Sequence, residues 1–96
     1  MIDPVTADPK HYSVEFENDK VRVLRVNYGP GEKSVMHSHP DTVAVFLSDA
    51  TAKFTYPDGK SEDADVKAGE AAWFPPHDHL PESKHDPVHA ILVELK

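Results

Sequence analysis

The sequence predicts an all-β domain, and three features lead to that expectation. Apolar and polar residues alternate through most segments, turn residues recur at short intervals, and no segment has a convincing helical period. Short strands joined by tight turns build either a sandwich or a closed barrel. With 96 residues, the chain is long enough for one hydrophobic core and therefore for one domain.

Two strands are expected before the first glycine-rich turn. Tyr12, Val14 and Phe16 alternate with polar neighbours, as in a half-buried strand, and the β-branched segment 21–28 should pair with it. Residues 1–10 have two prolines and no periodicity, so we expect an N-terminal arm that is ordered only where something tethers it. Residues 11–96 then form the domain.

The second half of the chain should supply the remaining strands. A hairpin is expected around Pro57–Lys60, because Pro, Asp and Gly each suit a turn position there. The segment 80–87 is polar and is expected to be a loop. The expected strands cover residues 42–47, 52–56, 61–66, 71–74 and 88–95.

Charge and composition exclude several classes of function. Ten basic and 17 acidic residues give a net charge of −7, which disfavours nucleic acid as a partner. Without cysteine, neither a disulfide nor a thiolate site can form, so any metal must bind to nitrogen and oxygen. No signal peptide or membrane span is evident, so we expect a cytoplasmic protein that does not bind membranes.

His37 and His39 are the strongest chemical signal in the chain. In an extended segment their imidazoles lie on the same face, as two ligands of one metal would. A third ligand must come from elsewhere, and the second histidine cluster, Pro75–His79, is the place to look. The alternative is chance, since seven of the 96 residues are histidine.

The spacing of these motifs resembles that of the cupin superfamily, in particular its small single-domain members. Gly31 is followed after five residues by His37-Ser38-His39, and Gly69 is followed after five residues by Pro75 and then by His79. The resemblance implies a small antiparallel β-barrel of the jelly-roll type. It also implies one divalent transition metal in the barrel mouth, bound by His37, His39 and His79, with iron(II), zinc, nickel and manganese as the candidates.

The chain departs from the cupin pattern at several positions. Val43 and Ala44 stand where the family has a glutamate ligand, and Ser83 stands near the usual asparagine. His77 replaces a glycine. It could be a fourth ligand, although a place on the rim is favoured.

The predicted ligand set suggests what the site would bind. Three neutral imidazoles leave the charge of a metal uncompensated, which favours anionic or chelating molecules. The resemblance suggests a dioxygenase-type enzyme acting on a diketone, thiol or keto acid, with no catalytic side chain assigned. The alternatives are a zinc-dependent hydrolase, isomerase or lyase, or a non-catalytic cupin that binds or senses a small ligand. A homodimer is expected.

The remaining histidines and aromatic residues have plainer interpretations. His11 and His85 should be exposed, whereas His89 should lie in the core with the apolar residues of its face. Trp73 and Phe74 should pack inside the barrel. Candidate cavity linings are Tyr28, Met36, Phe46 and Phe54.

Overall fold

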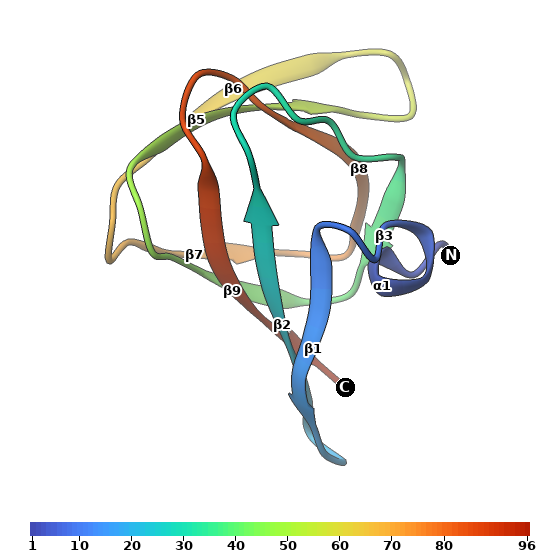
Figure 1. The fold of residues 1–96 in the computed structure, drawn as a ribbon. Coiled ribbons are helices and arrows are strands. Elements are labelled where there is room, and N and C mark those ends of the chain that lie inside the picture. The colour runs from blue at the N-terminus through green and yellow to red at the C-terminus, as the bar shows by residue number, and fades with distance from the viewer.

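The chain folds into two antiparallel β-sheets that face each other (Figure 1). The computed structural model describes all residues, Met1–Lys96. The elements are α1 (Pro4–Ala7), β1 (Tyr12–Glu17), β2 (Val21–Tyr28), β3 (His37–His39), β4 (Thr42–Phe46), β5 (Ala50–Thr55), β6 (Ser61–Val66), β7 (Ala71–Phe74), β8 (His77–Ser83) and β9 (Val88–Leu95). No helix has the length or the apolar character to cross a membrane.

The two sheets are the two layers of a jelly roll, and each has its own strand order. The larger sheet has the order β1-β2-β9-β4-β7, and the smaller sheet has the order β3-β8-β5-β6. The prediction of an all-β, antiparallel, cupin-like domain is confirmed. Hydrogen bonds do not close the sheets into a barrel, because β1, β7, β3 and β6 each remain an edge.

The core forms where inward-facing residues of neighbouring strands meet. Tyr12 lies opposite Val26, and Val26 in turn lies opposite Ala90, so β1, β2 and β9 contribute to one buried row. Leu24 and Tyr28 complete this cluster. Burying a side chain such as Leu24 stabilises a fold by about 1.5–3 kcal/mol.

The predicted hairpin is present between β5 and β6. Residues Ala50–Thr55 pair with Ser61–Val66 in antiparallel register. Asp58 Oδ1 accepts a hydrogen bond from the backbone nitrogen of Lys60 at 2.9 Å, and Gly59 has a φ of 87°. That left-handed conformation favours glycine, so the turn residues determine this connection locally.

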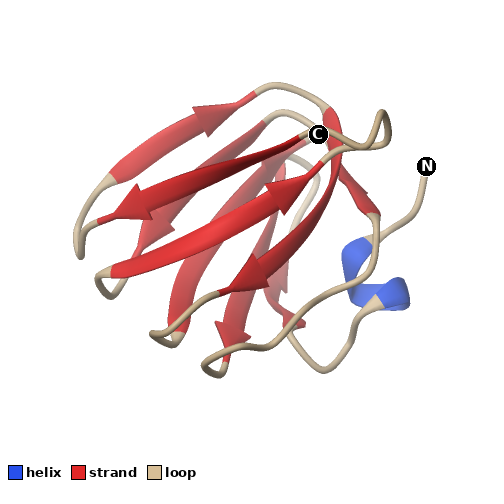
Figure 2. Ribbon diagram, turned by 90° about the horizontal axis from the view of Figure 1, so that it is seen from above, coloured by secondary structure: helices blue, strands red, loops and turns tan.

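The N-terminal segment is tethered to β3, which explains why it is ordered. Asp3 caps α1 by accepting a hydrogen bond from the backbone nitrogen of Thr6. Ile2 and Ser38 exchange two further bonds, from Ser38 N to Ile2 O at 2.7 Å and from Ile2 N to Ser38 Oγ at 3.1 Å. Since Ser38 lies between His37 and His39, this tether also holds the first histidine motif. Figure 2 shows α1 to one side of the strands.

The prediction of a loop over residues 80–87 is wrong for its first half, because β8 continues to Ser83. This strand lies between β3 and β5, and Pro81 pairs in register with Phe54. Although proline lacks a backbone donor, its carbonyl accepts a hydrogen bond from Ser34 N at 2.9 Å. Ser83 is buried and donates to the Gly29 carbonyl. Long-range pairing therefore overrides the polar composition of this segment.

Candidate metal centre

Adjacent strands carry the histidines of both sequence motifs. His37 and His39 are the ends of β3, which pairs antiparallel with β8. In this register His79 lies opposite His37, and His77 lies opposite His39. Directly opposed residues point to the same side of a sheet, as do residues two apart in one strand. All four imidazoles consequently share one face.

Three of these imidazoles form a compact group. The ring centroids are separated by 4.8 Å for His37 and His39, and by 4.9 Å from each of these to His79. Each pair is nearly perpendicular, with interplanar angles of 84°, 87° and 88°. Their potential ligand atoms all lie within 4.8 Å of one another. His37 and His39 are buried. The structure thus brings together the three predicted ligands.

The Nε2 atoms of His37, His39 and His79 are buried and have no hydrogen-bond partner in the protein. They are the only buried side-chain polar atoms in the chain of which this is true. Proteins rarely leave such atoms unpaired. Neutral imidazole nitrogen is a common ligand of zinc, iron, copper and nickel. The donor set therefore fits a divalent transition metal.

The other ring nitrogen of each histidine is held by a hydrogen bond. His37 Nδ1 donates to the Val35 carbonyl at 2.8 Å, and His77 Nδ1 donates to the Pro75 carbonyl at 2.7 Å. A neutral His77 then has a lone pair on Nε2, which accepts from His79 Nδ1 at 3.3 Å. His37 and His79 are thereby held in the tautomer that leaves Nε2 free. His77 lies outside the group of converging nitrogens and orients His79 instead.

Burial favours the neutral imidazole at His37, His77 and His79. Burial, together with the neighbouring His39, lowers the pKa of His37 to about 4 and that of His79 to about 2. The pKa of His77 is also lowered, chiefly by burial. Near neutral pH the Nε2 lone pairs of His37 and His79 are therefore available as ligands.

Comparison with solved structures identifies the fold. A cupin domain from Bordetella pertussis Tohama I superimposes with a TM-score of 0.79 at 22% identity, over 88% of this chain and 91% of that one. The chain has the cupin fold. A cupin superfamily protein from Desulfitobacterium hafniense matches with a TM-score of 0.65 at 15% identity, over 88% and 74% of the two chains.

A third solved structure matches the chain to a similar degree. An RmlC-like cupin family protein with a double-stranded β-helix fold from Methanocaldococcus jannaschii has a TM-score of 0.65 at 16% identity, with 92% and 83% of the two chains covered. No protein-family model matches the sequence, and no curated protein matches it. These likenesses concern the fold, while the chemistry of the site depends on this chain's own residues.

This cupin fold contains a cavity of about 70 Å³ beside the histidines. His39, His77 and His79 line one side of it, and most of the other lining residues are hydrophobic. Tyr12 and Tyr28 also line it, with their hydroxyl groups 2.8 Å apart. Of the four predicted lining residues, Tyr28, Phe46 and Phe54 reach the cavity, whereas Met36 does not. The space suits a ligand of few atoms with an apolar surface.

Strand alternation decides between the two positions where a cupin glutamate was expected. Ala44 is buried and lines the cavity together with His39 and His79. Val43 pairs with Val93 and Trp73 on the opposite, outward side of the larger sheet. Ala44 therefore occupies the cavity-facing position, and its methyl group presents an apolar wall there.

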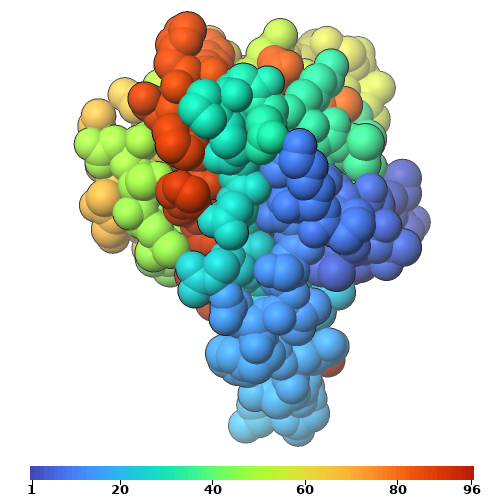
Figure 3. All heavy atoms as spheres, in the orientation of Figure 1, coloured from blue at the N-terminus to red at the C-terminus, as the bar shows by residue number.

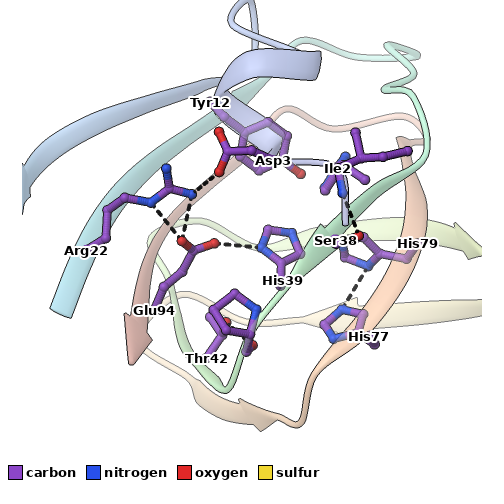
Figure 4. Close-up of polar contacts among 12 residues, drawn as sticks. Ile2, Asp3, Tyr12, Arg22, Ser38, His39, Thr42, His77, His79 and Glu94 are labelled. Atoms are coloured by element: carbon purple, nitrogen blue, oxygen red, sulfur yellow. Dashed lines mark hydrogen bonds and ion pairs between the residues drawn. The ribbon is translucent and has the colours of Figure 1, made fainter. Parts of the chain in front are cut away.

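The sequence analysis missed a chain of charged residues behind His39. The Glu94 carboxylate accepts from His39 Nδ1 at 3.0 Å through Oε2, and from Arg22 through Oε1 at 2.8 and 2.9 Å (Figure 4). Arg22 also forms an ion pair with Asp3, with 2.5 Å between Nη2 and Oδ1. Glu94 is 3% exposed. One feature of the sequence could have indicated this chain of charged residues: Glu94 is an acidic residue within the apolar strand β9. In the structure it faces inward and lies opposite Arg22 of β2.

Two of the three remaining histidines differ from expectation. His11 is buried, not exposed: its Nδ1 lies 2.7 Å from Asp8, and its ring stacks on Tyr28 at a centroid distance of 4.2 Å. His89 is not a core residue, because its face of β9 points outward and its Nδ1 bonds to Asn27 Oδ1 at 2.8 Å. His85 is exposed, as predicted.

Proposed function

We propose that this cupin binds one divalent transition metal through Nε2 of His37, His39 and His79, and that a small anionic or chelating molecule binds beside it. One observation carries the proposal: the buried Nε2 atoms of the three histidines have no partner in the protein, and the potential ligand atoms of these residues lie within 4.8 Å of one another. The Nδ1 atoms of the same rings are held by Val35, Glu94 and His77. Such outer partners are typical of metal-ligating histidines.

The charge of the ligand set supports an anionic ligand. Neutral imidazoles contribute no negative charge, and Glu94, the carboxylate that contacts His39, is already paired with Arg22. The charge of a bound divalent ion would therefore be balanced by an enolate, carboxylate or thiolate. The apolar cavity walls would exclude water around the rest of the molecule.

We favour a dioxygenase-type reaction on a diketone, thiol or keto acid. A bound iron(II) would supply the redox chemistry of such a reaction, whereas zinc would supply a Lewis acid for a hydrolase, isomerase or lyase. The protein's part is to hold the three imidazoles in one tautomer and to orient the substrate against the apolar wall.

A non-catalytic role in binding a small ligand is the second candidate. The observation that favours it is the engagement of Glu94, whose two oxygens contact His39 and Arg22. A carboxylate held in this way is poorly placed to act as a general acid or base on a substrate.

Metal titration of single-residue variants tests the proposal. Wild type should bind one equivalent of cobalt(II) or zinc(II) by calorimetry, while His37→Ala, His39→Ala and His79→Ala should each bind more than about 100-fold more weakly. His77→Ala should weaken binding by about 10–100-fold, as expected for a group that only orients a ligand. The exposed His85→Ala variant is the matched control and should bind as wild type does. Undiminished binding by His79→Ala would refute the assignment.

Oxygen uptake separates the two candidate functions. The iron(II)-loaded protein is supplied in turn with diketones, thiols and keto acids, and dioxygen consumption is followed with an electrode. Uptake that depends on both substrate and His79 supports the enzyme. Binding of the same molecules without uptake supports the non-catalytic role.

A further inference from the structure

The cavity beside the histidines has few polar groups other than the imidazoles. Of the two aromatic residues expected inside the barrel, Phe74 lines the cavity, whereas Trp73 is 55% exposed and does not pack inside, contrary to the expectation from sequence. Apart from the histidines, the side-chain hydrogen-bond donors that line the cavity are the hydroxyl groups of Tyr12, Tyr28, Thr42 and Ser83. A ligand in the cavity can meet these groups.

Two of the four hydroxyl groups already donate to the backbone. Thr42 Oγ1 donates to the Pro40 carbonyl at 2.7 Å, and Ser83 Oγ donates to the Gly29 carbonyl at 2.5 Å. A carbonyl oxygen can only accept, so each of these bonds uses the single proton of its hydroxyl group. Thr42 and Ser83 therefore have no proton to offer a ligand unless one of these bonds breaks.

The hydroxyl groups of Tyr12 and Tyr28 share one hydrogen bond of 2.8 Å, in which either group can be the donor. Both residues are 3% exposed. Two hydroxyl groups have two protons and this bond uses one, so the second proton needs another acceptor. Ser34, which also hydrogen-bonds to Tyr28, can accept it when Tyr12 donates to Tyr28. When Tyr28 donates to Tyr12 instead, the proton of Tyr12 is left for the cavity.

Buried polar residues enclose the side of this tyrosine pair that faces away from the cavity. Ser34 Oγ donates to Asp8 Oδ2 at 2.5 Å, and Asp8 Oδ2 lies 2.7 Å from His11 Nδ1. All three residues are buried. Figure 3 shows the residues before β1 (blue) packed directly against the segment that follows β2. A ligand therefore meets the pair from the cavity.

Tyr12 contacts two of the three predicted metal ligands. Its ring meets that of His37 at a centroid distance of 4.8 Å and that of His39 at 6.1 Å. Burial, followed by the neighbouring Tyr28, raises the pKa of Tyr12 well above its usual value. Near neutral pH the hydroxyl group of Tyr12 is therefore protonated and can donate to an anion.

We propose that the Tyr12 hydroxyl group donates a hydrogen bond to the ligand in this cavity, and that this contact selects short carboxylic acids that carry a keto or thiol group. The inference rests on the proposed function, because the ligand is the one bound beside the metal. An anion can only accept hydrogen bonds, so it stabilises the order in which Tyr28 donates to Tyr12 and Tyr12 donates to the ligand. Tyr28 is then a positioning residue.

The size of the cavity and the number of acceptors on the ligand narrow the class of molecule. The cavity of about 70 Å³ is roughly twice the ~30 Å³ that a water molecule occupies in the liquid, which suits about three to five non-hydrogen atoms. A diketone that binds a metal through both oxygens has no acceptor left for Tyr12. A short keto or thiol acid that binds through its keto oxygen or sulfur and one carboxylate oxygen keeps the second carboxylate oxygen free.

Mercaptoacetate and ethanethiol are a matched pair of probes, because both offer a thiolate and only mercaptoacetate also offers a carboxylate. Absorption spectroscopy of the cobalt(II)-loaded protein measures both dissociation constants, and the chain has no cysteine that could react with a thiol. Tyr12→Phe should weaken mercaptoacetate binding at least about tenfold, as expected for the loss of a hydrogen bond to a charged group, and change ethanethiol binding by less than about twofold. Tyr28→Phe should weaken mercaptoacetate binding less than Tyr12→Phe does, because Tyr12 can still donate.

Tyr56→Phe is the matched control, since it removes the same hydroxyl group from a residue that bonds to Glu62 and does not line the cavity. It should bind both probes as wild type does. Circular dichroism checks the fold of each variant, and calorimetry checks its cobalt(II) affinity. A wild type that binds no cobalt(II) would refute the metal centre and this inference together. If Tyr12→Phe binds cobalt(II) but keeps wild-type affinity for mercaptoacetate, loses both probes equally, or loses less than Tyr28→Phe, only the role of Tyr12 is overturned.

Discussion

The Nδ1 atoms of the clustered histidines determine what their Nε2 atoms can do. A carbonyl oxygen can only accept a hydrogen bond, so Val35 O forces the proton of a neutral His37 onto Nδ1. Pro75 O does the same for His77, which then orients His79. Two backbone carbonyls thus help direct the lone pairs of His37 and His79 to one point. Backbone geometry therefore leaves these two nitrogens free for the proposed metal.

Ala44 is the position at which a carboxylate would change the site. We expect Ala44→Glu to place an acidic oxygen in the cavity, balance the charge of a bound metal and weaken azide binding to the cobalt(II) form by about tenfold or more, which corresponds to ~1.4 kcal/mol. Absorption spectroscopy measures this affinity.

Val43→Glu is the control for this substitution, because Val43 faces outward. Its azide affinity should equal that of wild type. If Ala44→Glu keeps both the metal and the wild-type affinity, Ala44 does not face the metal. If the new carboxylate does not reach the metal, a lower melting temperature should reveal a buried, unpaired charge.

Glu32 should contribute to the pH dependence of stability. Hydrogen bonds from Lys10 Nζ at 2.8 Å and from the Gly29 backbone at 2.6 Å lower its pKa from 4.5 to about 2. Since the folded pKa lies below the unfolded one, the ionised group stabilises the fold above pH 4.5, and this contribution is lost as the pH falls toward 2.

Thermal unfolding of Glu32→Gln at several pH values measures this contribution. The variant should melt below wild type at pH 7, and the difference should shrink steadily between pH 4.5 and pH 2. A difference that stays constant over this interval would mean that the charge of Glu32 does not matter. Because the carboxylate is partly exposed, added salt should also reduce the difference.

At the level of elements, α1 and the two residues before it, Ile2 and Asp3, form a clamp, that is, a short segment that contacts both sheets. The helix consists of only four residues, too few to be stable in isolation, so its order depends on its contacts. Asp3 caps the helix and pairs with Arg22 of the larger sheet, and Ile2 bonds to Ser38 of the smaller one. The clamp therefore joins β2 to β3, behind the histidines.

Replacing Asp3, the charged residue of the clamp, should lower the stability of the fold while changing the affinity for metal only slightly. Asp3→Ala loses a helix cap worth about 1 kcal/mol, which corresponds to a decrease of about 4–8 °C in Tm for a domain of this size. Metal affinity should change by less than about tenfold, because Arg22 keeps its contact with Glu94. Differential scanning calorimetry and metal titration measure the two effects. The exposed Asp86→Ala variant serves as control, and an unchanged Tm in Asp3→Ala would contradict the clamp.

On the scale of the whole molecule, the proposed metal site joins strands that are distant in sequence. His37 and His79 come from β3 and β8, and Glu94 comes from β9 in the other sheet. A ligand that holds these residues together binds only the folded chain, so it shifts the folding equilibrium by mass action. Metal binding and global stability should therefore be coupled.

Thermal denaturation with and without metal tests this coupling. At a free metal concentration of 100 times Kd, the stabilisation should be about 2.7 kcal/mol, or roughly 10–20 °C in Tm. A chelator should reverse the shift, and His85→Ala should retain it. The same increase in His79→Ala would show that the metal stabilises the protein from another site.

Local patterns in the sequence were sufficient for much of the fold. Alternation predicted β1 and β2, turn chemistry predicted the β5–β6 hairpin, and His37 and His39 could be placed on one face, because each depends on residues close together in the chain. The spacing of the two histidine motifs suggested the cupin fold. His79 was nominated by the same spacing.

Only the tertiary structure decided which face of each strand is inside and what lies opposite it. Alternation groups His89 with Ile91 and Val93 but cannot say that this face points outward, nor that Ala44 and not Val43 lines the cavity. The pairing of Glu94 with His39, and the burial of His11 by Asp8 and Tyr28, join residues from separate segments. Register and burial arise from contacts between distant segments, and no local pattern in the chain contains them.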